Sequence, residues 1–489
     1  MTALTRRNLI HLSAGAALAA AAGPVRARPT QRDLRDDVAI LRQAWETLHP
    51  GLYRYNTADQ IRDRLTALET AWLAAPAFAD QLLALTRATA TVRCGHTYPS
   101  PYNSADDLVA SMYPGRTLVP FRFRWIGGRM IVTNDDSAEG IFSPGSIVTA
   151  INGAPCERLL AALIPLARAD GGNDPKRISL MEVRGDDGYE TFDIHLPLIL
   201  RGLEGAADFA LSDGRTVRAG LLSLEQRRAK RAAPAPGGDV NPWTLVRRDD
   251  GVAVLTMPSW SLYRSTFDWR GWLGGVMGDL TATSARGLIV DLRGNEGGLD
   301  CGDVILSRLI GQDLALADDQ RWTRYRSAPD HLHPHLKTWD RSFLDWGDSA
   351  AGPDARGFYR LSRFDDVEAG SVLRPEGRRF AGPVIVLCDA SNSSATFQFA
   401  RTVKDNGLAT LMGQTTGGNR RGINGGAFFF LTLPATGFVV DLPLIASLPV
   451  TPQPDAGIEP DIRVETTAED IAAGRDPEMA AAIGRLLVA

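Results

Sequence analysis

Two loops rich in glycine or serine each follow a short apolar run, and such loops can hold reacting groups. Residues Arg293–Gly298 follow the run 287–292, and Asp389–Ala395 follow the run 384–388. Glycines allow close backbone approach and expose successive N–H groups that bind anions. A serine at a helix start lies beside free N–H groups that stabilise developing negative charge. The loops therefore permit nucleophilic chemistry at Ser394, although either loop alone is also typical of a tight turn or an N-cap.

A serine nucleophile needs a general base, and the chain offers few lysines. Only four of its 53 basic residues are lysine, and Lys404 lies ten residues into the helix expected after Ser394, so it points away. The others would have to fold in from elsewhere: Lys176, Lys230 and Lys337. Histidine suits general-base work near neutral pH. Of the six histidines after residue 27, His96 stands out because it lies beside a glycine where the helical part of the chain ends, although a lone histidine is more often structural than catalytic. The other five are His49, His195, His331, His333 and His335.

Other chemistries have weaker support in the sequence. It contains no GxSxG, HExxH or GxxxxGK[ST] motif. The histidines at 331, 333 and 335 could bind a metal, but they lie in a polar stretch without a nearby cysteine. The four cysteines lack CxxC spacing and read as small buried hydrophobes, with a Cys94–Cys301 bridge left open.

The secondary structure that the sequence predicts around these residues changes from helices to strands along the first half of the chain. Residues 31–91 show helical spacing, as in Leu34, Val38, Leu41 and Trp45. Residues 100–220 show short strands with Gly, Asn and Asp turns, including the alternating segment 121–125. The basic cluster 227–231 predicts a solvated helix end, and the Pro/Gly-rich run after it predicts a linker.

From Gly251 onward, strand and helix patterns alternate, which predicts an α/β core. The expected strands are 251–257, 287–292, 384–388 and 409–412, and the expected helices are 267–280, 303–310 and 395–405. Residues 427–433 and 437–442 flank a hairpin signal, and 331–379 reads as an irregular polar insertion.

Composition and the N-terminal sequence indicate the class of the protein and its cellular location. The 489 residues are 44% hydrophobic and 22% charged with a net charge of −4, which favours a globular protein without a nucleic-acid partner. Residues 1–27 begin with Arg6-Arg7 and continue with an alanine-rich stretch, which predicts a twin-arginine-type signal peptide. We therefore expect export to the periplasm or the exterior, with no integral membrane segment in the mature chain.

Six ordered motifs resemble those of the tail-specific, or C-terminal-processing, serine peptidase family. They are Cys94–Thr97, the PDZ-like segment Gly145–Gly153, Gly287–Gly298, Val384–Asp405, Met412–Gly418 and Gly457–Asp461. Asn419 stands where one branch of that family has its catalytic lysine, so the chain resembles instead the tricorn-like and retinoid-binding-protein-like branch, which uses serine and histidine.

The resemblance implies a role for each site residue. Ser394 would be the nucleophile and His96 the base, with the N–H groups of Ala395 and of Gly297 or Gly298 as oxyanion donors. The acid that would complete a catalytic triad is not at the family's position in this sequence. Pro454 occupies about the place of the family's glutamate, with Asp455 beside it and Glu459 as a weaker candidate.

The resemblance also implies a crotonase-like spiral of ββα units as the catalytic core. The expected organisation is a signal (1–27), a helical region (30–99), a PDZ-like β-rich domain (100–226), a linker (227–242) and a peptidase domain (243–489). The expected function is hydrolysis of peptide or protein substrates through an acyl-enzyme, with no metal or organic cofactor. Two alternatives stay open, a non-catalytic ligand- or peptide-binding protein on the same fold and an esterase for small acyl esters.

Overall fold

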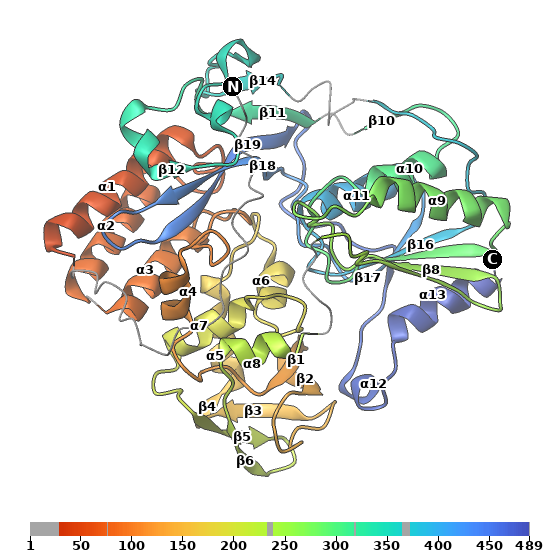
Figure 1. Cartoon of the computed structure of the whole chain (residues 1–489), viewed down its shortest axis with the longest axis horizontal. Helices are drawn as coiled ribbons and strands as arrows, with labels where there is room; N and C mark the ends of the chain where they lie inside the picture. The colour runs from red at the N-terminus through yellow and green to blue at the C-terminus, as the bar shows by residue number, and fades with distance from the viewer. Residues whose placement is uncertain (1–28, 76, 232–237, 317–318, 364–371, 489) are drawn as a thin grey trace, which may run out of the picture.

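The computed structural model describes residues 29–75, 77–231, 238–316, 319–363 and 372–488. These residues form a mixed α/β structure with three main sheets, and the sheets lie in separate parts of the molecule (Figure 1). The predicted signal peptide, residues 1–27, lies outside the described residues, as do residues 232–237 of the predicted linker.

Helices dominate the described N-terminal part, as the apolar spacing predicts. They are α1 (Gln31–Leu48), α2 (Ala58–Ala74), α3 (Phe78–Ala90) and α4 (Asp106–Met112). Thr30 and Thr57 begin the first two helices with capping boxes, in which each threonine side chain accepts from the N3 backbone. Leu34, Val38 and Leu41 are buried along one face of α1.

A mainly antiparallel sheet follows, with strand order β1-β2-β3-β5-β6 and β4 paired to β3. Its strands are β1 (Phe121–Ile126), β2 (Arg129–Asp135), β3 (Ile147–Ile151), β4 (Ala154–Pro155), β5 (Ala206–Leu211) and β6 (Thr216–Gly220). The helices here are α5 (Cys156–Leu163), η1 (Ile164–Leu166), α6 (Asp174–Leu180), α7 (Thr191–Ile199) and α8 (Leu224–Ala229). Burial alternates along β1, which confirms the predicted half-buried strand, while the likeness to a PDZ domain stays a prediction.

The basic cluster 227–231 ends α8 with Arg228 and Lys230 exposed, as the sequence predicts, but Arg227 departs from that prediction. Arg227 is buried, and its guanidinium pairs with Asp193 at 2.9 Å and with Asp136 at 3.2 Å. A charge run does not reveal which of its members finds buried carboxylates, because both partners are distant in sequence.

The second sheet has the order β20-β17-β16-β9-β8-β7 and is parallel except for β7. Its strands are β7 (Thr244–Arg247), β8 (Val252–Thr256), β9 (Gly287–Asp291), β16 (Val384–Cys388), β17 (Thr410–Gly413) and β20 (Ile462–Arg463). Helices α9 (Trp269–Ala282), α10 (Gly302–Leu309) and α11 (Ser394–Asp405) lie on one face and α13 (Pro477–Val488) on the other (Figure 1), with α12 (Ala468–Ala472) before it. This confirms the α/β pattern predicted from Gly251 onward.

The third sheet has the order β12-β18-β19-β11-β14-β13. Its long hairpin is β18 (Ile423–Thr432) and β19 (Val439–Pro449), and its short strands are β11 (Asp319–Thr323), β12 (Leu336–Lys337), β13 (Ala350–Ala351) and β14 (Tyr359–Leu361). The predicted irregular insertion therefore supplies ordered strands to this sheet. It also contains η2 (Asp330–His335), η3 (Arg341–Leu344), η4 (Gly347–Ser349) and β15 (Val372–Leu373), which pairs with β10 (Leu314–Ala315).

The N-terminal helices and the third sheet share one hydrophobic core. Trp72 and Phe78 pack on Phe438 with ring centroids 6.0 and 5.3 Å away. Cys94 belongs to this core and Cys301 to the core of the parallel sheet, so the bridge considered between them is not formed, and both are free buried thiols. None of the described helices is long and apolar enough to cross a membrane.

Candidate active site

The two loops singled out in the sequence meet because β9 and β16 are parallel neighbours. Parallel strands end at the same edge of a sheet, where α/β proteins place their sites. Asn392 connects the loops: its Nδ2 donates to the carbonyls of Leu292 at 2.6 Å and Asn295 at 3.0 Å. Thr396 Oγ1 also donates to the Asn295 carbonyl at 2.9 Å. These bonds fix the serine loop against the glycine loop.

Ser394 begins α11 in a strained backbone conformation. Its φ is 51°, which is uncommon for a residue with a side chain and is often found at functional sites. Gly297 lies opposite: a Cβ built there would be 3.0 Å from the Ser394 Cβ and 2.9 Å from the Ala395 nitrogen. The absence of a side chain at Gly297 is what lets the glycine loop approach the serine this closely.

Backbone donors lie around this point. Ala395 is the second residue of α11, so its N–H has no acceptor within the helix. The Gly297 N–H already donates to Asn295 Oδ1 at 2.9 Å, which leaves the Gly298 N–H as the better candidate of the glycine pair. Gly298 has a φ of 141° and lies so close to the Trp260 carbonyl that only glycine fits.

His96 lies in a loop after α3 that is attached to β19. The Ser100 N–H donates to the Val439 carbonyl at 3.0 Å, and the Asp441 N–H donates to the Tyr98 carbonyl at 3.1 Å. The His96 ring packs against Phe428 of β18, with ring centroids 5.6 Å apart. Its Nδ1 is buried without a hydrogen-bond partner, and within the described residues His96 and Ser394 are not hydrogen-bonded to each other.

His49 supports the same loop from α1. The Gly51 N–H donates to His49 Nδ1 at 2.9 Å, so Nε2 carries the proton toward Thr97 Oγ1, 2.8 Å away. Burial lowers the pKa of His49 to about 3, so it stays neutral. His49 therefore positions the residue next to His96 rather than acting as a base.

Asp170 is a carboxylate near His96 that the sequence argument missed. Its Oδ1 accepts from the Gly95 N–H at 2.9 Å. Burial lowers the pKa of His96, and Asp170 is the strongest of the charges that oppose this. Asp170 is 75 residues beyond Gly95 in an ordinary Gly-rich turn, so no local signal could have identified it.

The two acids proposed from the family pattern make other contacts. Asp455 Oδ1 accepts from the Gly172 N–H at 2.9 Å and from Asn419 Nδ2 at 2.7 Å. Glu459 accepts from Thr415 Oγ1 at 2.9 Å and pairs with Arg463. These contacts do not bring either carboxylate to His96, so a role as the third catalytic member stays a prediction.

Lys176 is the lysine that does fold in from elsewhere. Its Nζ donates to the Ser391 carbonyl at 3.1 Å and pairs with Glu296, which directly precedes Gly297. Lys404 pairs instead with Asp461, on the far side of α11.

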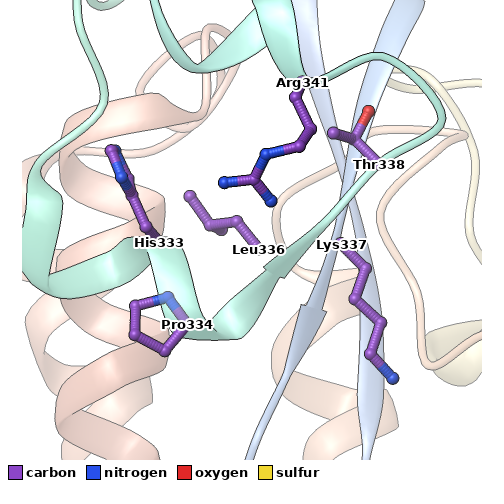
Figure 2. Close-up of a pocket in the computed structure, with 6 residues that line it drawn as sticks. All are labelled: His333, Pro334, Leu336, Lys337, Thr338 and Arg341. Carbon is purple, nitrogen blue, oxygen red and sulfur yellow. The ribbon is translucent and has the colours of Figure 1, made fainter. Parts of the chain in front are cut away.

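The histidines at 331, 333 and 335 do not assemble into a metal site. His331 Nε2 is 2.9 Å from Gln43 Oε1, and His333 Nε2 is 2.9 Å from the Ala328 carbonyl. The described part of the chain contains no cluster of three or more potential metal ligands. His333 and Lys337 line a hollow of about 640 Å³, in which the Lys337 amine points away from the His333 ring (Figure 2). None of the candidate catalytic residues lines this hollow.

Comparison with known proteins bears on the family and the fold of the chain. Residues 251–464 match the sequence model of peptidase family S41. The structure of mature CPAF complexed with lactacystin superposes with a TM-score of 0.61 at 15% identity, covering 94% of this chain and 98% of that one. Mature CPAF alone gives 0.58 at 16% identity with the same coverage, a likeness that concerns the fold. The photosystem II D1 C-terminal processing protease covers 91% of this chain and 96% of that one at 14% identity, but its TM-score of 0.42 is too low to carry an argument. A comparison with curated proteins found no match.

The fold and the family match together define a serine peptidase. Residues 251–464 match peptidase family S41, the tail-specific or C-terminal-processing peptidases. The resemblance inferred from the six motifs is thereby confirmed at the level of the family.

Proposed function

We propose that this chain is an exported serine peptidase in which Ser394 and His96 cleave peptide bonds through an acyl-enzyme. The observation that carries the proposal is Ser394 at the start of α11, held at positive φ directly against Gly297. The choice of base is supported by Arg168, which donates to the Gly95 carbonyl next to His96 and pairs with Glu296 of the glycine loop.

In the proposed reaction, His96 accepts the Ser394 hydroxyl proton as Ser394 Oγ attacks the peptide carbonyl. The N–H groups of Ala395 and Gly298 stabilise the oxyanion that forms. His96 then donates its proton to the leaving amine, and a water molecule hydrolyses the acyl-enzyme by the same steps. Because burial lowers the pKa of His96, the ring is neutral and able to accept a proton at neutral pH.

Export rests on the sequence of residues 1–27 alone. The proposal predicts that the protein recovered outside the cytoplasm begins near Arg28, which intact-mass measurement checks. A secreted chain that retains Met1 would contradict it.

The test of the catalytic proposal is labelling of the purified mature protein with a fluorophosphonate probe, mapped by mass spectrometry. We expect a covalent adduct on Ser394, no adduct in Ser394→Ala, and a rate at least about 10³-fold lower in His96→Ala. Ser393→Ala is the matched control, because Ser393 Oγ donates to the Glu296 carbonyl at 3.1 Å and should not react.

Hydrolysis of a peptide library and of a small acyl ester should accompany the labelling. Faster turnover of peptides than of the ester, lost in Ser394→Ala, supports the peptidase. An unlabelled wild-type protein whose melting temperature is normal would contradict the proposal and favour a binding function.

A further inference from the structure

Two buried cations lie behind the candidate active site. Arg168 and Lys176 have side chains that are 17% and 3% exposed; Arg168 follows η1, and Lys176 lies in the first turn of α6. Moving a cation out of water is costly unless a partner compensates it. Such groups are therefore expected to have specific partners.

Glu296 is the shared partner of both cations. Its Oε1 pairs with Lys176 Nζ, and its Oε2 is 3.5 Å from Arg168 Nη2. The Glu296 side chain is itself 43% exposed, so it reaches solvent from the loop that carries Gly297. We call Arg168, Glu296 and Lys176 the Glu296 cluster.

The remaining donors of the two cations reach the other catalytic loops. Arg168 Nη1 donates to the carbonyl of Gly95 at 2.9 Å, and Gly95 directly precedes His96. Lys176 Nζ donates to the Ser391 carbonyl at 3.1 Å, three residues before Ser394. The cluster is therefore connected to the histidine loop, the glycine loop and the serine loop, which are far apart in the sequence.

We propose that the Glu296 cluster is a positioning network, in which Glu296 holds Arg168 and Lys176 so that they fix the loops of His96, Gly297 and Ser394 relative to one another. This inference rests on the proposed Ser394–His96 mechanism. The residues act through those groups and do not touch the reacting atoms. Because the Glu296 carboxylate holds both cations that reach the other two loops, a neutral side chain at 296 loosens all three loops at once.

The charges of the cluster also act on His96, which provides a specific readout. Burial lowers the pKa of His96; Asp170 and Glu296 raise it, whereas Arg168 and Lys176 lower it. Burial alone would raise the pKa of Glu296, but Lys176 and Arg168 bring it down to about 2, so Glu296 is ionised over the working range. Burial lowers the pKa of Lys176 and Glu296 opposes this.

The signs of the expected pH shifts follow directly. His96 accepts a proton only when neutral, so the rate rises with pH through its pKa. Glu296→Gln removes a negative charge that favours the His96 imidazolium. The acid limb of the pH–rate profile, where the rate rises as His96 loses its proton, therefore moves to lower pH. Lys176→Met removes a positive charge that disfavours the imidazolium, so the acid limb moves to higher pH. A purely structural defect would not shift the limb in opposite directions.

The experiment measures the fluorophosphonate labelling rate of Ser394 against pH in the mature protein. We expect Glu296→Gln to lower the plateau rate by about 10- to 100-fold through misplacement of the loops. Its melting temperature should fall, because two cations lose their carboxylate, and the shift in pH dependence separates the positioning effect from this loss of stability. Glu296→Asp keeps the charge and should retain the wild-type position of the acid limb. Asp80→Asn is the matched control, because Asp80 lies on α3, is 41% exposed and pairs with Arg201 rather than with a residue of the Glu296 cluster.

Unchanged rates and pH limbs in both Glu296→Gln and Lys176→Met would overturn the network while leaving the Ser394–His96 proposal intact. Shifts of both limbs in the same direction would also overturn it. Failure of wild-type labelling is a different result, which contradicts the proposed function itself.

Discussion

At the scale of single residues, the site depends on backbone conformations that few side chains tolerate. Ser394 has a φ of 51° and Gly297 a φ of 100°. These two residues face each other so closely that a Cβ at Gly297 would lie 2.7 Å from the Ser393 carbonyl oxygen. The cost of a non-glycine residue at such a φ is about 1–3 kcal/mol, in addition to the clash.

Gly297→Ala should therefore reduce activity far more than it reduces stability. We expect the rate of Ser394 labelling to fall by about 10²- to 10³-fold, because the glycine loop must withdraw and take its N–H donors with it. Gly275→Ala is the control: Gly275 lies in α9 with open space around it, where alanine should add up to about 1 kcal/mol of stability. A wild-type labelling rate in Gly297→Ala would show that the glycine loop supplies no donor.

At the scale of elements, a buried carboxylate attaches the first helix to the hairpin that carries the histidine loop. Asp37 of α1 accepts from the N–H groups of Ala435 at 3.0 Å and Thr436 at 2.8 Å, in the turn between β18 and β19. The Thr436 hydroxyl donates to the same carboxylate at 2.8 Å. The hairpin in turn binds the loop of His96, so α1 contributes to the site without touching it.

Asp37→Ala should destabilise the protein by about 1–3 kcal/mol, since three donors lose their acceptor in a buried place. Urea unfolding measures this difference. Asp36→Ala is a matched control on the same helix turn. Asp36 is 64% exposed, and its contact with Arg32 is a long one of 4.0 Å, so its loss should cost little. Equal midpoints for the two variants would show that the turn contacts contribute nothing.

At the scale of the whole molecule, the two proposed catalytic residues come from parts of the chain with separate hydrophobic cores. The N-terminal helices and the β18–β19 hairpin bury one set of apolar side chains, including Trp72, Phe429 and Leu442. Ser394 begins α11, which packs on the parallel sheet, whereas His96 lies in the loop that follows α3. The proposed Ser394–His96 pair therefore requires residues that precede the predicted peptidase domain, 243–489.

A chain shortened to residues 243–489 should therefore neither stay soluble nor label at Ser394. The loss of α1–α3 exposes the apolar face of β18 and β19, and large exposed apolar patches promote aggregation. Sedimentation and fluorophosphonate labelling of the shortened chain check this. A soluble, cooperatively unfolding chain that still labels would show that the helices and His96 are dispensable.

The sequence alone determined the parts of this protein that depend on local patterns. Apolar runs without alternation predicted β9 and β16, and the loops that follow these strands contain Gly297 and Ser394. The two loops lie close together because parallel neighbouring strands end at the same edge of the sheet. Six motifs in order also predicted the family correctly. The predictions for the basic cluster 227–231 and for the 331–379 insertion were correct only in part, since Arg227 and β12 find their partners in distant segments.

Only the tertiary structure decided which charged groups surround the site. Asp170, Arg168 and Lys176 lie in a segment without a catalytic motif, and each reaches its partner across 73 to 215 residues of chain. Asp455, which the family pattern placed nearest the missing acid, contacts Gly172 and Asn419 instead. Strand and loop patterns are local and can be read from sequence, whereas pairing of buried charges depends on how separate segments pack, and the free energy of that packing is not encoded in any one segment.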